Sequence, residues 1–273
     1  MIITNKTKLN AVIGFPLVHT KSPILHHMIY QILKLDAVLL AFPGEDLESF
    51  VQSVRTLPIG LVAVTMPFKE KILHYLDECC SSVEALKAVN TIINQNGKLK
   101  GYNTDVDGIA FALKDITLHR KNVLLIGAGG AARAAAYFLK KHFVNIFWYN
   151  RSKENALRIK DEFGGTIINT IHDIDDKIDI IINATPSGMF PENHTTPLPD
   201  FQFSAEQIVF DMIYHPINTT LLNNAKNLGA KIISGLDMFI GQGIRQIELW
   251  TGKKLCEGWK SHEIETILKK GLV

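Results

Sequence analysis

The chain has 273 residues, of which 47% are hydrophobic and 21% charged, and its formal net charge is +2. This composition is that of a folded globular protein and excludes a disordered or fibrous chain. The near-balance of charge provides no binding surface for a phosphate backbone, so we expect no nucleic-acid partner. The apolar runs are much shorter than a spanning helix requires, so we expect no membrane partner.

The three cysteines are Cys79, Cys80 and Cys256, and they form neither a disulfide framework nor a CxxC pair. We therefore expect no disulfide bond and no metal site. The first residues of the chain become polar at once and show no signal-peptide core. The sequence thus predicts a cytoplasmic protein that is a monomer or a homodimer.

Short β-rich runs alternate with helical patterns along the chain. We expect strands at 11–14, 37–42, 60–65, 91–94, 123–127, 145–149, 178–183, 208–211 and 231–234. Helices are expected at 23–33, 46–57, 131–142, 153–163 and 218–228, and in the tail at 238–251 and 261–270. This βαβα rhythm predicts an α/β fold with parallel sheets and helices on both faces.

Nine strands with a glycine-rich turn near the middle predict two α/β domains. We expect the first domain to comprise residues 1–105 together with 237–273, because a terminal helical segment often packs back on the first domain. The second domain, residues 106–236, then carries the glycine-rich turn. A cleft between two such domains is the default place for a ligand.

The first cluster of interest places the hydroxyls of Thr20 and Ser22 beside the first expected helix. Ser22 followed by Pro23 is typical of a helix N-cap and the first helical residue. A helix N-terminus flanked by hydroxyls suits a small carboxylate that itself bears hydroxyl groups. Taken alone, however, the cluster is explained better by ordinary helix capping.

The second cluster follows the third expected strand. Thr65 ends that strand, and Pro67 is expected to begin a helix whose first turn contains Lys69. The positive end of a helix dipole disfavours a cation and tends to lower a lysine pKa, which suits an acid–base group. The alternative is an exposed lysine paired with Glu70.

The third cluster lies at the expected domain junction. Asn90 precedes the fourth expected strand, and Asp105 stands near the point where the second domain begins. Their amide and carboxylate groups are suited to hydrogen-bonding the hydroxyls of a ligand. The alternative is that Asn103 and Asp105 are turn residues that open the next helix.

The fourth cluster runs from a buried strand through a G-x-G-x-x-A turn into an alanine-rich helix. Gly127 allows the tight turn, Gly129 lets the backbone approach a pyrophosphate, and Ala132 permits close packing of helix on strand. The amides at the helix N-terminus then face the phosphates of a dinucleotide. The alternative is a plain turn between strand and helix.

The strand after this turn ends at Asn150 with no acidic residue. Sites for NAD usually place an Asp or Glu there to hold the ribose 2′-hydroxyl. Here Arg151 stands at the point where a 2′-phosphate would bind, and Lys153 is nearby. The pattern therefore favours NADP over NAD. The alternative is that Arg151 is a solvated loop charge.

In their order along nearly the whole chain, these clusters resemble the shikimate dehydrogenase family, as do segments 183–189, 211–216 and 235–242. The resemblance implies an oxidoreductase that uses NADP(H) to interconvert 3-dehydroshikimate and shikimate on the route to chorismate and aromatic amino acids. It implies that Lys69 and Asp105 are catalytic. It implies substrate contacts from Thr20, Ser22, Thr65, Lys69, Asn90, Asp105, Tyr214 and Gln242. It implies cofactor contacts from Gly127, Ala128, Gly129, Gly130, Ala131, Asn150, Arg151, Ser152, Lys153, Thr185, Met189, Met212, Gly235 and Met238.

Three positions depart from the family's pattern. Thr20 stands where serine is usual, Ala63 where asparagine usually precedes Val-Thr, and Asn155 where a second basic residue often follows Asn-Arg. Thr20 and Asn155 leave open a quinate/shikimate dehydrogenase that uses NAD. Ala63 leaves open a dinucleotide-binding paralogue with little catalysis, although the presence of Lys69 and Asp105 counts against it.

Overall fold

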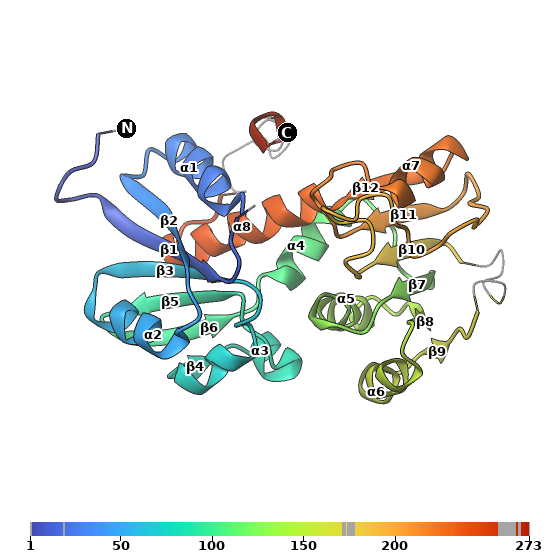
Figure 1. The fold of residues 1–273 in the computed structure, drawn as a ribbon, viewed down its shortest axis with the longest axis horizontal. Coiled ribbons are helices and arrows are strands. Elements are labelled where there is room, and N and C mark those ends of the chain that lie inside the picture. The colour runs from blue at the N-terminus through green and yellow to red at the C-terminus, as the bar shows by residue number, and fades with distance from the viewer. Residues whose placement is uncertain are drawn as a thin grey trace. The chain divides into compact units, whose positions relative to one another are not determined.

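The computed structural model describes residues 2–18, 20–170, 173, 178–255, 266 and 269–272. The chain forms two compact units, and each is built on its own six-stranded sheet (Figure 1). The first unit consists of Met1–Asp107 and Gln242–Val273, and the second of Gly108–Gly241. Within the described part of the chain, no helix has the length and apolar character needed to cross a membrane.

The first unit contains most of the elements that precede residue 108. In chain order these are β1 (Lys8–Gly14), α1 (Ser22–Ile32), β2 (Ala37–Pro43), α2 (Leu47–Thr56), β3 (Ile59–Val64), the 3-10 helix η1 (Lys71–Tyr75), β4 (Glu78–Cys79), α3 (Ser81–Leu86), β5 (Thr91–Gln95) and β6 (Lys98–Tyr102). Helix α4 (Asp105–Ala112) carries the chain into the second unit, and α8 (Gly235–Thr251) returns it to the first.

The first sheet is mixed, with the strand order β2-β1-β3-β5-β6-β4. Strand β1 is parallel to β2 and β3, whereas β5 is antiparallel to both β3 and β6. The prediction of parallel strands throughout is therefore wrong for this sheet. A two-residue turn joins β5 to β6, with φ of +55° at Asn96 and +87° at Gly97. An Asn-Gly pair readily adopts such angles, so it reverses the chain at this point.

Both segments of the first unit pack against its sheet. Strands β1 and β3 are buried, and α2 packs Val51 and Val54 into the same hydrophobic cluster. The later part of α8 contributes Trp250, whose ring lies 5.8 Å from that of Tyr30. A Cβ atom at Gly60 would lie only 2.4 Å from the Trp250 side chain, so this strand needs glycine there. Residues from both ends of the chain thus pack against this sheet.

The second unit has a sheet in which every strand is parallel to its neighbours. Its elements are β7 (Asn122–Ile126), α5 (Gly130–Lys140), β8 (Asn145–Tyr149), α6 (Lys153–Phe163), β9 (Thr166–Ile167), β10 (Ile180–Asn183), β11 (Ile208–Asp211), α7 (Thr220–Asn227) and β12 (Lys231–Ser234). The strand order is β12-β11-β10-β7-β8-β9, which is the doubly wound order of dinucleotide-binding folds. In this order the topological switch point falls between β7 and β10.

All nine expected strands are present, and the α/β class is confirmed. The sequence did not predict β4, β6 or β9, because β4 and β9 have two residues each and β6 carries two lysines. Helix α3 was also not predicted as an element, whereas α4 begins at Asp105, as in the alternative in which Asn103 and Asp105 open the next helix. Most of the helix expected at 261–270 lies outside the described residues. The third cysteine, Cys256, also lies outside them.

Candidate functional site

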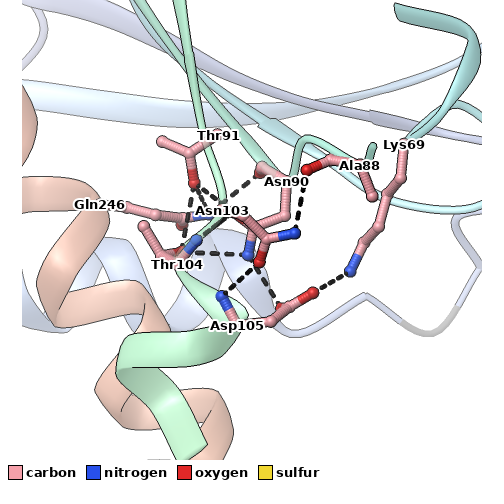
Figure 2. Close-up of polar contacts among 8 residues, drawn as sticks. All are labelled: Lys69, Ala88, Asn90, Thr91, Asn103, Thr104, Asp105 and Gln246. Carbon is pink, nitrogen blue, oxygen red and sulfur yellow. Dashed lines mark hydrogen bonds and ion pairs between the residues drawn. The ribbon is translucent and has the colours of Figure 1, made fainter. Parts of the chain in front are cut away.

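Lys69 and Asp105 form an ion pair, with 2.6 Å between Nζ and Oδ2 (Figure 2). The lysine side chain is 32% exposed and the aspartate side chain 14% exposed. Asp105 is the first residue of α4, where the helix dipole favours an anion. The pair therefore combines a carboxylate that is mostly buried with an ammonium group that solvent or a ligand reaches.

The backbone around Lys69 differs from the prediction. Lys69 lies in a turn between β3 and η1, and the predicted helix starting at Pro67 is absent from this described segment. The Lys69 carbonyl accepts a hydrogen bond from the Val89 amide at 2.8 Å, so it does not serve a helical bond to Leu73. Lys69 therefore lies outside a helix, one residue before the N-cap of η1, Glu70. Its ion-pair partner is Asp105 rather than the neighbouring Glu70.

Asn90 holds Asp105 from the other side. Its side chain is buried, and Nδ2 donates to Asp105 Oδ1 at 2.8 Å and to Thr104 Oγ1 at 3.0 Å (Figure 2). Its Oδ1 accepts from the Thr104 amide at 2.7 Å and lies 2.8 Å from the Thr91 hydroxyl. The Asp105 amide in turn donates to Asn103 Oδ1 at 3.2 Å. Each carboxylate oxygen thus has a fixed donor, one from Lys69 and one from Asn90.

The two hydroxyl-bearing loops follow the neighbouring parallel strands β1 and β3. The Thr65 amide donates to Ile13 O at 3.0 Å, and the Phe15 amide donates to Met66 O at 2.9 Å. These bonds bring the segment that precedes α1 beside the segment that leads to Lys69. The carboxyl ends of parallel strands are where α/β sheets usually carry their ligands.

The start of α1 differs by one residue from the expected capping arrangement. Lys21 occupies the N-cap position and Ser22 is the first helical residue, and no side chain caps the helix. The prediction of Ser22 as the N-cap is therefore wrong. The Ser22 amide donates to Thr20 Oγ1 at 3.4 Å, and both side chains are half-buried.

Two further residues of the first unit bear on this site. Gln242 is half-buried on α8. Ala63, where the family usually has asparagine, is buried in β3 opposite Thr91 of β5. The ion pair between Lys69 and Asp105 forms with this smaller residue in place.

The glycine-rich turn of the second unit joins β7 to α5. Gly127 has a φ of +110°, and a Cβ atom there would lie 3.0 Å from the Thr185 side chain, which follows β10. Gly129 is the N-cap of α5, and a Cβ atom at Gly129 or Gly130 would meet no atom within 4 Å. Ala132 is fully buried and lets the helix pack closely. The exposed first amides of α5 are therefore accessible to a phosphate.

The turn after β8 is held by its own side chains. Asn150 Nδ2 donates to Ser152 O at 2.8 Å, and Ser152 caps α6 by accepting from the Asn155 amide at 3.3 Å. Arg151 and Lys153 are both exposed beside this helix N-terminus. The arrangement presents two cations at the end of β8, and the Asn155 side chain is exposed as well.

A buried carboxylate links the loops after β10 and β11. Asp211 Oδ1 accepts from Asn183 Nδ2 and from the Ile213 amide, both at 3.1 Å, and Oδ2 accepts from the Thr219 hydroxyl at 2.7 Å. Asn183 Oδ1 accepts from the Thr185 hydroxyl at 2.7 Å. Burial raises the pKa of Asp211 from 3.8 to about 6, because the three donors only partly offset the loss of water.

The other predicted cofactor residues also belong to the second unit. A Cβ atom at Gly235 would lie 2.3 Å from Met212 O, so the close approach of α8 to this loop requires glycine. The Met212 amide donates to Asn183 O at 3.0 Å. Met238 is buried and Met189 is partly exposed. Ala128 and Ala131 flank the glycines of the turn and are half-buried.

Tyr214 stacks on Phe239 of α8, with ring centroids 4.5 Å apart and an angle of 14° between the planes. Burial of its hydroxyl raises the pKa of Tyr214. Both residues belong to the second unit.

The sequence alone did not single out Thr91, Thr104 or Gln246 as site residues. The first two adjoin predicted residues in the chain, and their short polar side chains complete the network around Asn90. Gln246 Nε2 lies 3.0 Å from Thr91 Oγ1 and comes one helical turn after Gln242 on α8 (Figure 2). An i, i+4 spacing on one helix was therefore the available signal.

Three family models match most of the chain. They are described as the shikimate dehydrogenase substrate binding domain, matched by residues 12–92, shikimate / quinate 5-dehydrogenase, matched by residues 110–211, and the shikimate 5′-dehydrogenase C-terminal domain, matched by residues 235–255. The shikimate dehydrogenase (NADP(+)) of Maridesulfovibrio salexigens is 38% identical over 261 residues, which cover 94% of this chain and 96% of that protein.

Solved structures agree in fold over the same length. The crystal structure of shikimate dehydrogenase from Aquifex aeolicus has a TM-score of 0.90 and 33% identity, covering 99% of each chain. Shikimate 5-dehydrogenase from Thermus thermophilus, crystallised in complex with NADP(H) and shikimate, has a TM-score of 0.87 and 31% identity. That comparison covers 97% of this chain and 99% of the other.

Proposed function

The chain belongs to the shikimate dehydrogenase family, and on that premise we propose that it catalyses the reversible NADP-dependent oxidation of shikimate to 3-dehydroshikimate. The observation that carries this proposal is the ion pair of 2.6 Å between Lys69 and Asp105, which Asn90 holds from the other side. An ammonium group fixed in this way is suited to exchange a proton with an alcohol.

The catalytic roles follow from the chemistry of the carbonyl group. Reduction of the ring ketone generates an alkoxide, which needs a proton and charge stabilisation. We assign that proton to Lys69 Nζ, and in the reverse direction the neutral amine accepts the proton of the substrate hydroxyl. Asp105 orients Lys69 and accepts a hydrogen bond from a substrate hydroxyl. NADP(H), when bound, supplies or accepts the hydride.

Substrate recognition is assigned mainly to the first unit. The hydroxyls of Thr20 and Ser22, at the start of α1, bind the substrate carboxylate. This proposal is supported by the hydrogen bonds that place their segment beside the loop that follows β3. The remaining substrate contacts are assigned to Thr65, Asn90, Gln242 and Tyr214.

The second unit fits a dinucleotide. The open N-terminus of α5, from Gly127 to Ala131, suits the pyrophosphate, because nothing fills the space beside Gly129 and Gly130. Asn150, Arg151, Ser152 and Lys153 are assigned to the 2′-phosphate, whose charge two exposed cations match. The nicotinamide end is assigned to Thr185, Met189, Met212, Gly235 and Met238.

These assignments give the two parts of the chain separate roles. Residues 1–105 with 237–273 are the proposed substrate-binding and catalytic domain, and residues 106–236 the proposed dinucleotide-binding domain. The absence of a disulfide pattern in the sequence supports a cytoplasmic enzyme. We propose that it acts as a monomer or a homodimer.

The test is the absorbance of NADPH when the purified protein is mixed with shikimate and NADP+. We expect NADPH to form, and to form much faster than NADH does with NAD+. Binding of NADP+ without turnover of shikimate or quinate would instead indicate a dinucleotide-binding paralogue. Equal turnover with NAD+ and quinate would indicate the broader quinate/shikimate enzyme.

A further inference from the structure

Two buried polar atoms of the first unit lack a hydrogen-bond partner. These atoms are His26 Nε2 and Gln246 Oε1, and among the described residues no other fully buried side-chain nitrogen or oxygen shares this property. The His26 side chain is 0% exposed and Gln246 is 2% exposed. An unpaired buried polar group costs about 1–3 kcal/mol, so two of them together require an explanation.

Both atoms belong to the contact between α1 and the later part of α8. A Cβ atom at Gly243 would lie 2.5 Å from Leu25 and 4.0 Å from His26 Cε1, so the two helices pack closely at this point. The Gln246 side chain also contributes to the pKa of His26, which places it beside the ring. The two unpaired atoms therefore belong to the same contact.

The protonation state of His26 determines whether this contact lacks a hydrogen-bond donor or an acceptor. His26 Nδ1 lies 2.9 Å from Ser22 O, and a carbonyl only accepts, so Nδ1 carries a hydrogen. Burial lowers the pKa of His26 to about 4, so the ring is neutral at neutral pH. Nε2 is then an acceptor, and so is Gln246 Oε1. Two acceptors cannot bond each other, and the contact lacks a donor.

A half-turn of the Gln246 amide supplies that donor. It directs Nε2 toward His26 Nε2 and places Oε1 at the position 3.0 Å from Thr91 Oγ1, where the Thr91 hydroxyl donates to it. The backbone carbonyl of Asn90 loses the weak contact of 3.3 Å with Gln246. It keeps its bond of 2.8 Å from the Val64 amide, so this carbonyl is not left unpaired by the change.

With this orientation the donors of the network all run in one direction. Asn90 Nδ2 donates to Thr104 Oγ1 at 3.0 Å, and the Thr104 hydroxyl lies 3.2 Å from Thr91 Oγ1, to which it donates (Figure 2). Thr91 has a single hydroxyl hydrogen, so it exchanges its bond of 2.8 Å to Asn90 Oδ1 for a bond to Gln246, and Asn90 Oδ1 keeps the bond of 2.7 Å from the Thr104 amide. Gln246 then donates to His26, and His26 to the carbonyl of Ser22. Hydrogen bonds in such a chain polarise and strengthen one another. The second Nδ2 hydrogen of Asn90 remains for Asp105.

We propose that His26 and Gln246 are positioning residues, which terminate this hydrogen-bond chain and thereby fix the Asn90 side chain that holds Asp105 against Lys69. The proposal rests on the proposed function, because it assigns the effect to turnover by Lys69. Neither residue contacts the ion pair itself. Each acts through the amide and hydroxyl groups between them and Asp105.

The kinetic test uses the variants Gln246→Met and His26→Phe in the full chain. Each removes one end of the contact and keeps a side chain of similar volume. We expect each to lower kcat for shikimate oxidation by about tenfold, as loss of a supporting residue commonly does, and to leave KM for NADP+ unchanged. The double variant should fall little further than either single variant, because both break one chain.

Gln207→Met is the matched control. Gln207 is also buried, with Nε2 donating to Ile178 O and Oε1 accepting from the Ser204 amide, both at 3.0 Å, but it lies in the second unit. We expect this variant to lose thermal stability and to retain the wild-type kcat. A wild-type kcat in Gln246→Met, an equal loss in Gln207→Met, or a multiplicative loss in the double variant would each overturn the positioning role.

A measurement on the wild-type protein tests the proposed hydrogen-bond chain even where a variant does not fold. Nitrogen NMR spectra of labelled histidine at neutral pH should show His26 as a neutral ring, protonated at Nδ1 and hydrogen-bonded at Nε2. A proton on Nε2 would contradict the proposed hydrogen-bond chain. The spectrum does not depend on turnover, so it separates failure of this inference from failure of the proposed function, which the NADPH assay reports.

Discussion

Asp105 lies 36 residues after Lys69 in the chain, yet its carboxylate binds the Lys69 ammonium at 2.6 Å through one oxygen and the Asn90 amide at 2.8 Å through the other. This geometry predicts the effect of Lys69→Ala. We expect kcat to fall by about 10²- to 10⁴-fold, because general acid–base groups contribute this much, with a smaller rise in KM for shikimate. Steady-state kinetics with shikimate and NADP+ measure both values.

The control for this prediction is Lys98→Ala. Lys98 is an exposed lysine of the same unit that pairs with Glu78, so its loss should leave kcat unchanged. Asp105→Asn should lower kcat to a similar degree as Lys69→Ala, and the double variant should show no multiplicative loss. A Lys69→Ala enzyme with near-normal kcat would contradict the assignment of the proton to this residue.

The exposed Arg151 at the end of β8 predicts the cofactor preference. Arg151→Ala should raise KM for NADPH by about 10- to 100-fold, which corresponds to the loss of one hydrogen-bonded charge contact, and should leave KM for NADH almost unchanged. Initial rates of 3-dehydroshikimate reduction with each cofactor measure the difference. Arg158→Ala is the matched control, since Arg158 is exposed on α6, the helix that follows Arg151, and pairs with Glu154. Equal effects of Arg151→Ala on both cofactors would show that this residue does not bind the 2′-phosphate.

The methyl group of Thr20 predicts a substrate preference. Quinate carries a hydroxyl on the carbon that bears its carboxylate, so it needs more room beside Thr20 than shikimate does. We expect Thr20→Ser to raise kcat/KM for quinate relative to shikimate by about tenfold, the usual order for one methylene-sized change. Competing rates with the two substrates and NADP+ measure the ratio. An unchanged ratio would mean that Thr20 does not contact this end of the substrate.

The buried Asp211 predicts a pH dependence of stability in the second unit. Its pKa rises from 3.8 to about 6 on folding, so the folded protein favours the protonated form. The associated stability is complete below pH 3.8 and is lost as the pH rises to about 6. Relative to Asp211→Asn, which does not titrate, the free energy of unfolding of the wild type should therefore fall by about 3 kcal/mol over this range.

Hydrogen exchange of the amides in β10 and β11 measures this difference at each pH, because it reports on the second unit by itself. Effects of other titrating groups cancel between the two proteins. A difference that is constant with pH would show that Asp211 keeps its ordinary pKa.

The fold was largely predictable because hydrophobic strands and amphipathic helices have strong periodic patterns. The failures have local causes. Lys98 and Lys100 interrupt the apolar pattern of β6, although the Asn96-Gly97 turn before it is typical of a hairpin. The first sheet is mixed because β5 runs antiparallel to both β3 and β6.

The site was predictable only in part. Lys69 and Asp105 stood out as charged residues beside strand ends, but the bond from Val89 to the Lys69 carbonyl, which prevents a helix there, comes from a different part of the chain. Gln246 was missed for a similar reason, since its partner Thr91 lies 155 residues earlier. Contacts of this kind depend on the finished fold, and the i, i+4 spacing of Gln246 from Gln242 does not by itself reveal them.

The division of the first unit between two stretches of sequence also affects how the protein is made. Gly108–Gly241 is continuous, so the ribosome delivers all of the second unit before it delivers Gln246 or Trp250. Until then the hydrogen-bond network around Asn90 lacks Gln246, and the Trp250 side chain is not yet packed against β3 at Gly60. Domains commonly fold in the order of their synthesis. Here the part that is translated first should be the last to reach its native core.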